Sequence, residues 1–186
     1  MRQICVLLVA ALAAACGGGP PSDEEIARAR GQAEDAAARL MKTLFEELTG
    51  ALKAGPPEEA LGVCGEKAQE LTRAIERETG VAVRRTSLKT RNPINAPDAY
   101  ERSWLEKAAA TPPTKAHAEV VETADGGYEL RYLRPLQIAE LCTQCHGEEL
   151  PSAVRDAVRS RYPSDQATGY KPGDLRGAVS VRVRFD

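Results

Sequence analysis

Aromatic residues, histidine and unbalanced charge are all scarce in this sequence. Phenylalanine, tyrosine and tryptophan together make up 4% of the chain, two residues are histidine, and the formal net charge is −2. A nearly neutral chain lacks the basic surface that nucleic-acid binding needs, so we expect no nucleic-acid partner. No catalytic triad, paired carboxylates or phosphate-binding loop stands out either. We therefore expect a binding protein rather than an enzyme.

Long hydrophobic runs are also missing, except at the N-terminus. Residues 1–15 carry one early positive charge, followed by an apolar run with the length of a signal-peptide core, which is short for a membrane span. The run ends in "LAAAC", which resembles the lipobox of bacterial lipoproteins, and residues 16–22 form a Gly/Pro tether. We expect an exported lipoprotein that faces the periplasm, with a lipid anchor on Cys16. Gly17 favours the outer membrane over the inner, and a cleaved signal with a free Cys16 is the alternative.

The remaining residues, 23–186, have the length of one domain. Apolar residues at three- and four-residue steps predict one long helix over 22–55 and a second over 57–80, each closed by glycine or proline. Beyond residue 80 the pattern alternates, which predicts strands with short helices between them. Strands are expected at 81–89, on both sides of a turn at 125–127, and at 178–186. This order predicts an α+β domain with an antiparallel sheet.

The last predicted strand has a regular alternation of apolar and polar residues. Val179, Val181, Val183 and Phe185 alternate with serine and arginine. Such a pattern is typical of a strand with one buried face and one face in solvent.

Cysteine is scarce too, and its distribution is informative. Five cysteines are present, of which Cys5 falls in the predicted signal peptide and Cys16 at the predicted anchor. Three remain, an odd number that disulfides alone cannot pair in an oxidising compartment. At least one of these thiols must therefore have another role.

Two of the three remaining cysteines stand in the sequence "CTQCH", within a predicted short helix. Cys-x-x-Cys-His is the attachment signal for haem c. One turn of chain places both thiols under the porphyrin edge, where each adds to a haem vinyl group, and the histidine then lies beneath the iron. Export strengthens this interpretation, because bacteria attach haem covalently outside the cytoplasmic membrane. We predict one haem c on Cys142 and Cys145, with His146 as the proximal iron ligand.

Two other uses of the same residues were weighed. Cys142 and Cys145 could form a redox dithiol, although His146 would then have no role. Together with Cys64 they have the ligand count of a zinc Cys₃His site, although the adjacent Cys145 and His146 fit one tetrahedral metal poorly.

The second axial position of the iron has several candidates. In familiar electron-transfer cytochromes it is a downstream methionine, but no methionine or histidine follows His146. Met41 lies beside the leucines of the first predicted helix, where core packing is the ordinary role, and His117 lies near a predicted strand start. Cys64 lies on the apolar face of the second predicted helix. It is either a small core residue or a thiolate ligand, and an open iron position is the remaining option.

Four separated motifs stand in order along the chain: "VCGEKAQEL", "LKTRNPINAPDAYE", "LRPLQIAELCTQCHG" and "DQATGYKPGDLRGAVSV". Together they resemble the periplasmic c-type haem domain family of PAS-like fold, which also occurs as the sensor half of bacterial signalling proteins. The resemblance covers residues 22–186 and implies a PAS-like antiparallel sheet, long N-terminal helices and one covalent haem with unusual Cys/His ligation. On the matching motif, Cys64 would be the distal iron ligand. Many relatives continue into output domains, whereas this chain ends at its last predicted strand, so we expect a separate redox or signalling partner.

The resemblance also bears on function. A thiolate opposite histidine occupies the second axial position of the iron, which argues against oxygen chemistry in the resting state. Thiolate ligation also favours a low reduction potential. Release of the thiolate on reduction would open the site, so we expect an exported redox or diatomic-gas sensor, with a low-potential electron-transfer cytochrome c as the alternative. Long N-terminal helices in sensors often dimerise, so a homodimer stays open. Haem propionates would find partners among four residues near the motifs: Lys89, Arg91, Tyr170 and Arg176.

Overall fold

Four antiparallel strands form one sheet in the order β1-β4-β3-β2. The structure is a computed structural model that describes residues 19–185, so the predicted signal peptide and Cys16 lie outside the described residues. The long β3 and β4 are central, and β2 and β3 are joined as the predicted hairpin. The strands are β1 (Ala82–Thr86), β2 (His117–Glu122), β3 (Tyr128–Gln137) and β4 (Leu175–Arg184).

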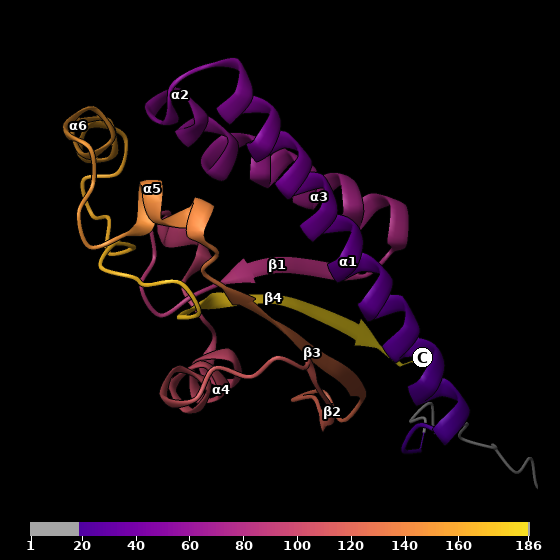
Figure 1. The fold of residues 1–186 in the computed structure, drawn as a ribbon. Helices are drawn as coiled ribbons and strands as arrows, with labels where there is room; N and C mark the ends of the chain where they lie inside the picture. The colour runs from indigo at the N-terminus through magenta and orange to yellow at the C-terminus, as the bar shows by residue number, and fades with distance from the viewer. Residues whose placement is uncertain (1–18, 186) are drawn as a thin grey trace, which may run out of the picture.

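Helices lie on both sides of this sheet, which confirms the predicted α+β class. Figure 1 shows α1 and α3 along one face and α4 on the other, while α5 and α6 lie beyond one end. Across residues 19–185, none of the helices has the length and apolar character that a membrane span requires. The α-helices are α1 (Asp23–Ala54), α2 (Pro57–Gly62), α3 (Ala68–Thr79), α4 (Ala99–Ala110), α5 (Thr143–His146) and α6 (Ser152–Arg161). Single turns of 3₁₀-helix lie at Pro93–Asn95 and Glu140–Cys142.

The first helix has two halves with different partners. It begins at a capping box, in which the Ser22 hydroxyl accepts from the Glu25 amide while the Glu25 carboxylate accepts from the Ser22 amide. The buried side chains of its first half are small and let α1 lie close against the sheet. Its second half carries larger apolar side chains that are only partly buried. The buried residues are Ala29, Ala33, Ala36, Ala37 and Leu40.

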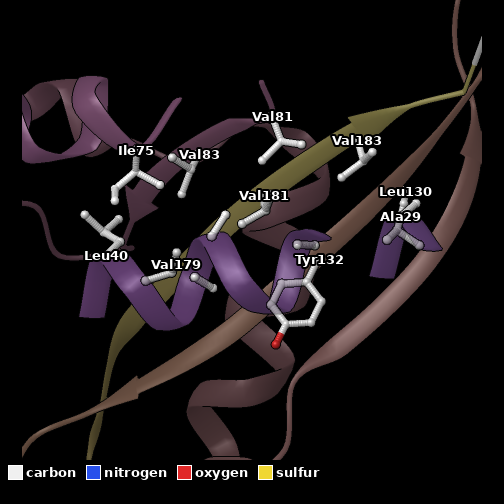
Figure 2. Packing of buried hydrophobic residues seen from close by; sticks show 13 residues of the cluster. Ala29, Leu40, Ile75, Val81, Val83, Leu130, Tyr132, Val179, Val181 and Val183 are labelled. Carbon is white, nitrogen blue, oxygen red and sulfur yellow. The ribbon is translucent and has the colours of Figure 1, made fainter. Parts of the chain in front are cut away.

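The main core lies between α1, α3 and the sheet. Figure 2 shows the valines of β4 on the face that meets Leu40 of α1 and Ile75 of α3. Val179, Val181 and Val183 are all buried, as their alternation predicted. Burial of such side chains away from water is the main favourable term in folding.

The prediction that β4 has one solvent face is wrong for half of the strand. Ala178 and Ser180 point to the opposite face and are as buried as the valines. The reason is α4, which contacts β4 and places Leu105 against Ala178 and the neighbouring Leu133. Small side chains on that face of β4 leave room for the helix.

The predicted helix over 57–80 is present but interrupted. A π-helix at Val63–Lys67 separates α2 from α3, and Gly80, with φ 72°, ends the helix in the left-handed conformation. The insertion contains Cys64. Single π-turns within α-helices are frequent at functional sites, because they move one side chain out of regular register.

Candidate haem site

One cavity of about 210 Å³ lies where the second half of α1, the π-helix and α5 come together. The short α5 contacts α2 and α6 at the end of the sheet (Figure 1). The structure thus brings together residues from distant parts of the sequence, from Met41 to Arg176. All four predicted haem-site residues line the cavity: Cys64, Cys142, Cys145 and His146.

One wall of the cavity is apolar. It is formed mainly by the second half of α1, with further side chains from α2, β3 and the segment before α5. Phe45 is 57% exposed although it belongs to this wall, so the lining also reaches the surface. A wall of this kind binds a large apolar group rather than a small ion. The α1 residues are Met41, Leu44, Phe45, Leu48 and Leu52.

The polar part of the cavity lining comes mainly from three arginines. Arg85, Arg91 and Arg176 line the cavity, and its described lining contains no aspartate or glutamate. Arg91 pairs with Asp165, whose Oδ1 lies 3.1 Å from the Arg91 Nε. Two buried polar atoms of the lining have no hydrogen-bond partner among residues 19–185, namely Arg91 Nη1 and Thr86 Oγ1. Both atoms are themselves covered by protein, and Thr86 alternates with Arg85 along β1, so the cationic character of the cavity rests on the arginines.

His146 has the geometry of a metal ligand. Its Nδ1 lies 2.6 Å from the backbone oxygen of Ala167. A carbonyl only accepts, so Nδ1 carries the proton and donates, and Nε2 keeps its lone pair. Burial lowers the pKa of His146 to about 3, and the nearby Arg176 and Arg91 add to this. The imidazole is therefore neutral at ordinary pH, as a metal-binding histidine must be.

A loop at residues 165–170 fixes α5 in place. The Arg91 Nη2 donates to the Cys145 oxygen at 2.7 Å, so this guanidinium joins α5 to Asp165. Two backbone hydrogen bonds add to this. The Gly169 amide donates to the Gly147 oxygen at 2.9 Å, and the Tyr170 amide donates to the His146 oxygen at 3.0 Å. A four-residue helix has no stability of its own, so these contacts determine its position.

Cys64 enters the cavity from the π-helix. The Arg85 Nη2 donates to the Cys64 backbone oxygen at 3.0 Å. Burial raises the pKa of the Cys64 thiol, and the three neighbouring guanidinium groups oppose that effect. Its burial and its place in the cavity agree with the prediction that it points inward.

Gly65, next to Cys64, packs against the hydroxyl of Tyr162. A Cβ on Gly65 would collide with that oxygen and lie 3.2 Å from the Tyr162 Cζ. We expect Gly65→Ala to lower the free energy of unfolding by about 1–3 kcal/mol through overpacking. Urea unfolding followed by circular dichroism measures this.

Gly62, one turn earlier, provides the matched control. Its nearest neighbour to an added Cβ would be the Arg161 Nη1 at 3.9 Å, which is ordinary contact. Because alanine favours helix over glycine by up to about 1 kcal/mol, Gly62→Ala should be neutral or stabilising. Equal unfolding midpoints for the two variants would contradict the packing role of Gly65.

Some of the other ligand candidates from the sequence line the cavity, and others do not. Cys64, Cys142 and Cys145 are free thiols, and among residues 19–185 no three His, Cys, Asp or Glu side chains gather closely enough to hold one metal ion. Met41 lines the cavity. His117 does not. It lies on β2, where its Nε2 is 2.9 Å from the Tyr100 hydroxyl, as expected of a satisfied histidine.

Two of the four predicted propionate partners line the cavity, and two do not. Arg91 and Arg176 line the cavity. Lys89 and Tyr170 are outside its lining and contact each other, with the Lys89 Nζ 4.5 Å from the centroid of the Tyr170 ring, and Tyr170 packs edge-on to His146. Their contact with a cofactor stays a prediction.

Sequence reasoning missed Arg85, Asp165 and Ala167. A signal for Arg85 was present, since Val81, Val83 and Arg85 share one face of β1 and both valines are buried. An arginine that continues a buried face indicates a buried anionic partner. Asp165 and Ala167 act through a loop whose path the sequence does not specify.

Comparison with known proteins places the chain in a recognised group. Residues 24–184 match the sequence model of the Tll0287-like family. A solved structure, described as the crystal structure of the cyanobacterial heme-protein Tll0287, matches with a TM-score of 0.64 and 23% sequence identity, over 89% of this chain and 98% of that one. No curated protein matches. At this identity the solved structure establishes the fold.

Proposed function

The chain belongs to the Tll0287-like family, and from this premise we propose that it is an exported haem c protein that senses redox state or a diatomic gas. One observation carries the proposal. The Cys-x-x-Cys-His helix and a third cysteine line the same cavity, which has an apolar wall and three arginines in its lining.

The residues of the cavity fit a haem on three independent grounds. The apolar wall matches a porphyrin, and the guanidinium groups match its acidic side groups. The His146 Nε2, with its lone pair free, fits iron.

Each of the four predicted residues then has one role. Cys142 and Cys145 hold the haem covalently, His146 is the proximal ligand and Cys64 the distal ligand. When bound, haem supplies a one-electron iron couple whose potential depends on its axial ligands. The Ala167 oxygen keeps His146 in one tautomer and orientation, as partners of metal-bound histidines do.

The position of Cys64 supports a sensor over a fixed electron carrier. It lies on a π-helix between two regular helices, and such insertions are frequent at functional sites. Release of the Cys64 sulfur on reduction would open the distal side and let this segment change. That supplies the two-state element that a sensor requires.

The test compares the ferric and ferrous holoprotein. A pyridine haemochromogen spectrum first establishes haem c. Carbon monoxide and nitric oxide are then added to both oxidation states, and ligation is followed by absorbance. We expect carbon monoxide to bind the ferrous form and to leave the ferric form unchanged. Identical ligation in both states, with no gas binding, would contradict the sensor and favour an electron carrier.

A low-potential electron-transfer cytochrome is the second candidate. Phe45 and Gln144 are both exposed and both line the cavity, so a bound cofactor would lie near the surface. A cofactor near the surface can exchange electrons with a separate protein. A sensor would also need a separate protein as its output partner.

We further infer that the protein is anchored to a membrane on its periplasmic side, with the outer membrane favoured. The lipobox-like "LAAAC" supports a lipid on Cys16. Mass spectrometry of the mature N-terminus and fractionation of a Cys16→Ser variant test this, and recovery of the unmodified protein in the periplasmic fraction would contradict it.

A further inference from the structure

Two of the arginines in the cavity lack a carboxylate partner. Arg85 and Arg176 are both well covered by protein, yet within residues 19–185 no aspartate or glutamate oxygen lies within 4.0 Å of either guanidinium. Arg91 differs, because Asp165 is its partner. Taking a charge out of water is costly unless an opposite charge compensates it, so an unpaired buried pair of arginines needs an explanation.

Hydrogen bonds to the backbone and to one serine hydroxyl hold both side chains at the cavity. The Arg85 Nη2 donates to the Cys64 oxygen at 3.0 Å. The Arg176 Nη1 donates to the Ser87 Oγ at 2.6 Å and to the Lys89 oxygen at 3.0 Å. A guanidinium has five N–H donors, so these contacts orient each group and leave further donors for a ligand.

Burial lowers the pKa of both guanidinium groups. For Arg85, the Cys64 thiol opposes this effect and Arg176 adds to it. For Arg176, Tyr170 and Asp165 oppose it and Arg91 adds to it. An anion bound at these arginines would offset the cost of their burial.

We propose that Arg85 and Arg176 form a carboxylate-binding site that holds the two acidic side groups of the haem. This rests on the proposed haem binding and adds Arg85 to the predicted carboxylate partners. Through its hydrogen bond to the Cys64 oxygen, Arg85 also connects the carboxylate site to the element that carries Cys64.

The first test uses the holoprotein with Arg85→Gln and Arg176→Gln. Each change leaves a haem carboxylate uncompensated, which favours the ferric iron. We expect spectroelectrochemistry to show the reduction equilibrium about tenfold less favourable in each variant, which is a midpoint lowered by about 59 mV for one electron. Arg176→Lys, which keeps the charge, should recover much of the shift. Arg182→Gln is the matched control, because Arg182 is exposed on the same strand as Arg176.

The second test measures the carboxylates directly. The full chain without covalent haem is titrated with mesohaem, which lacks vinyl groups, and with mesohaem dimethyl ester, and binding is followed in the Soret band. Wild type should bind the free acid about ten- to a hundredfold more tightly, because hydrogen bonds to charged groups are the strong ones. The Arg85→Gln, Arg176→Gln double variant should lose that preference.

The outcomes separate the two proposals. Equal binding of acid and ester by wild type, with unchanged midpoints in the arginine variants, would overturn the carboxylate site and leave haem binding intact. Failure of wild type to bind either porphyrin, together with a holoprotein preparation that has no haem, would instead contradict the proposed function.

Discussion

Replacing Cys142 and Cys145 together with alanine should abolish covalent haem attachment. Both thiols line the cavity and are free, and no other pair of cysteines in the described chain has the one-turn spacing of the motif. We expect a drop of about a hundredfold or more in haem that stays with the polypeptide on a denaturing gel, seen by peroxidase staining. The single variants should retain some attachment through the remaining thioether.

Cys64→Ala is the matched control for this experiment. Cys64 lines the same cavity but lies outside the motif, so its variant should keep the covalent haem. Covalent haem in the double variant at the wild-type level would show that the motif is not the attachment site. Loss of attachment in Cys64→Ala would show that the cavity rather than the motif limits maturation.

The second large effect is expected in the electron paramagnetic resonance spectrum of the ferric protein. A thiolate opposite histidine gives a low-spin signal that Cys64→Ala should remove, leaving a high-spin or differently ligated iron. The cause lies in the geometry, since Cys64 is the cysteine outside the motif that lines the cavity among residues 19–185. We expect near-complete loss of the thiolate signal.

Two further variants identify the alternative ligands. Met41 lines the cavity, so Met41→Leu tests a thioether ligand, whereas His117→Gln serves as the control because His117 is bonded to Tyr100 on the sheet. An unchanged spectrum in Cys64→Ala with a changed one in Met41→Leu would make Cys64 a core residue and favour an electron carrier.

Much of the fold follows from patterns that act over short distances. The capped first helix, the glycine that ends α3 and the hairpin at 125–127 each depend on neighbouring residues, and each was predicted. The second buried face of β4 was not, because it depends on α4, which packs there from a different part of the chain. The π-helix at Cys64 has the same origin: a regular helix satisfies the local pattern equally well, and the site's packing decides.

The candidate site shows the same division. The motif predicts Cys142, Cys145 and His146 as haem-site residues, because covalent haem attachment requires this spacing. The resemblance to a haem family favoured Cys64 as a ligand, whereas the local pattern alone left it as either a core residue or a ligand. The arginines of the cavity could be identified only from the fold. Arg85 lies on β1 and Arg176 on β4, and the pairing of these strands brings both to one cavity.

The two halves of α1 also set a distance. The helix has 32 residues, at about 1.5 Å per residue, and its cavity-lining part begins at Met41. The cavity therefore starts roughly 27 Å along the rod from Asp23 (Figure 1). If Cys16 carries the proposed lipid anchor, a helix of this length would act as a spacer between the bilayer and the haem site. A partner dissolved in the periplasm could then reach the site without touching the membrane, and shortening the helix by whole turns would bring the site closer to the membrane surface.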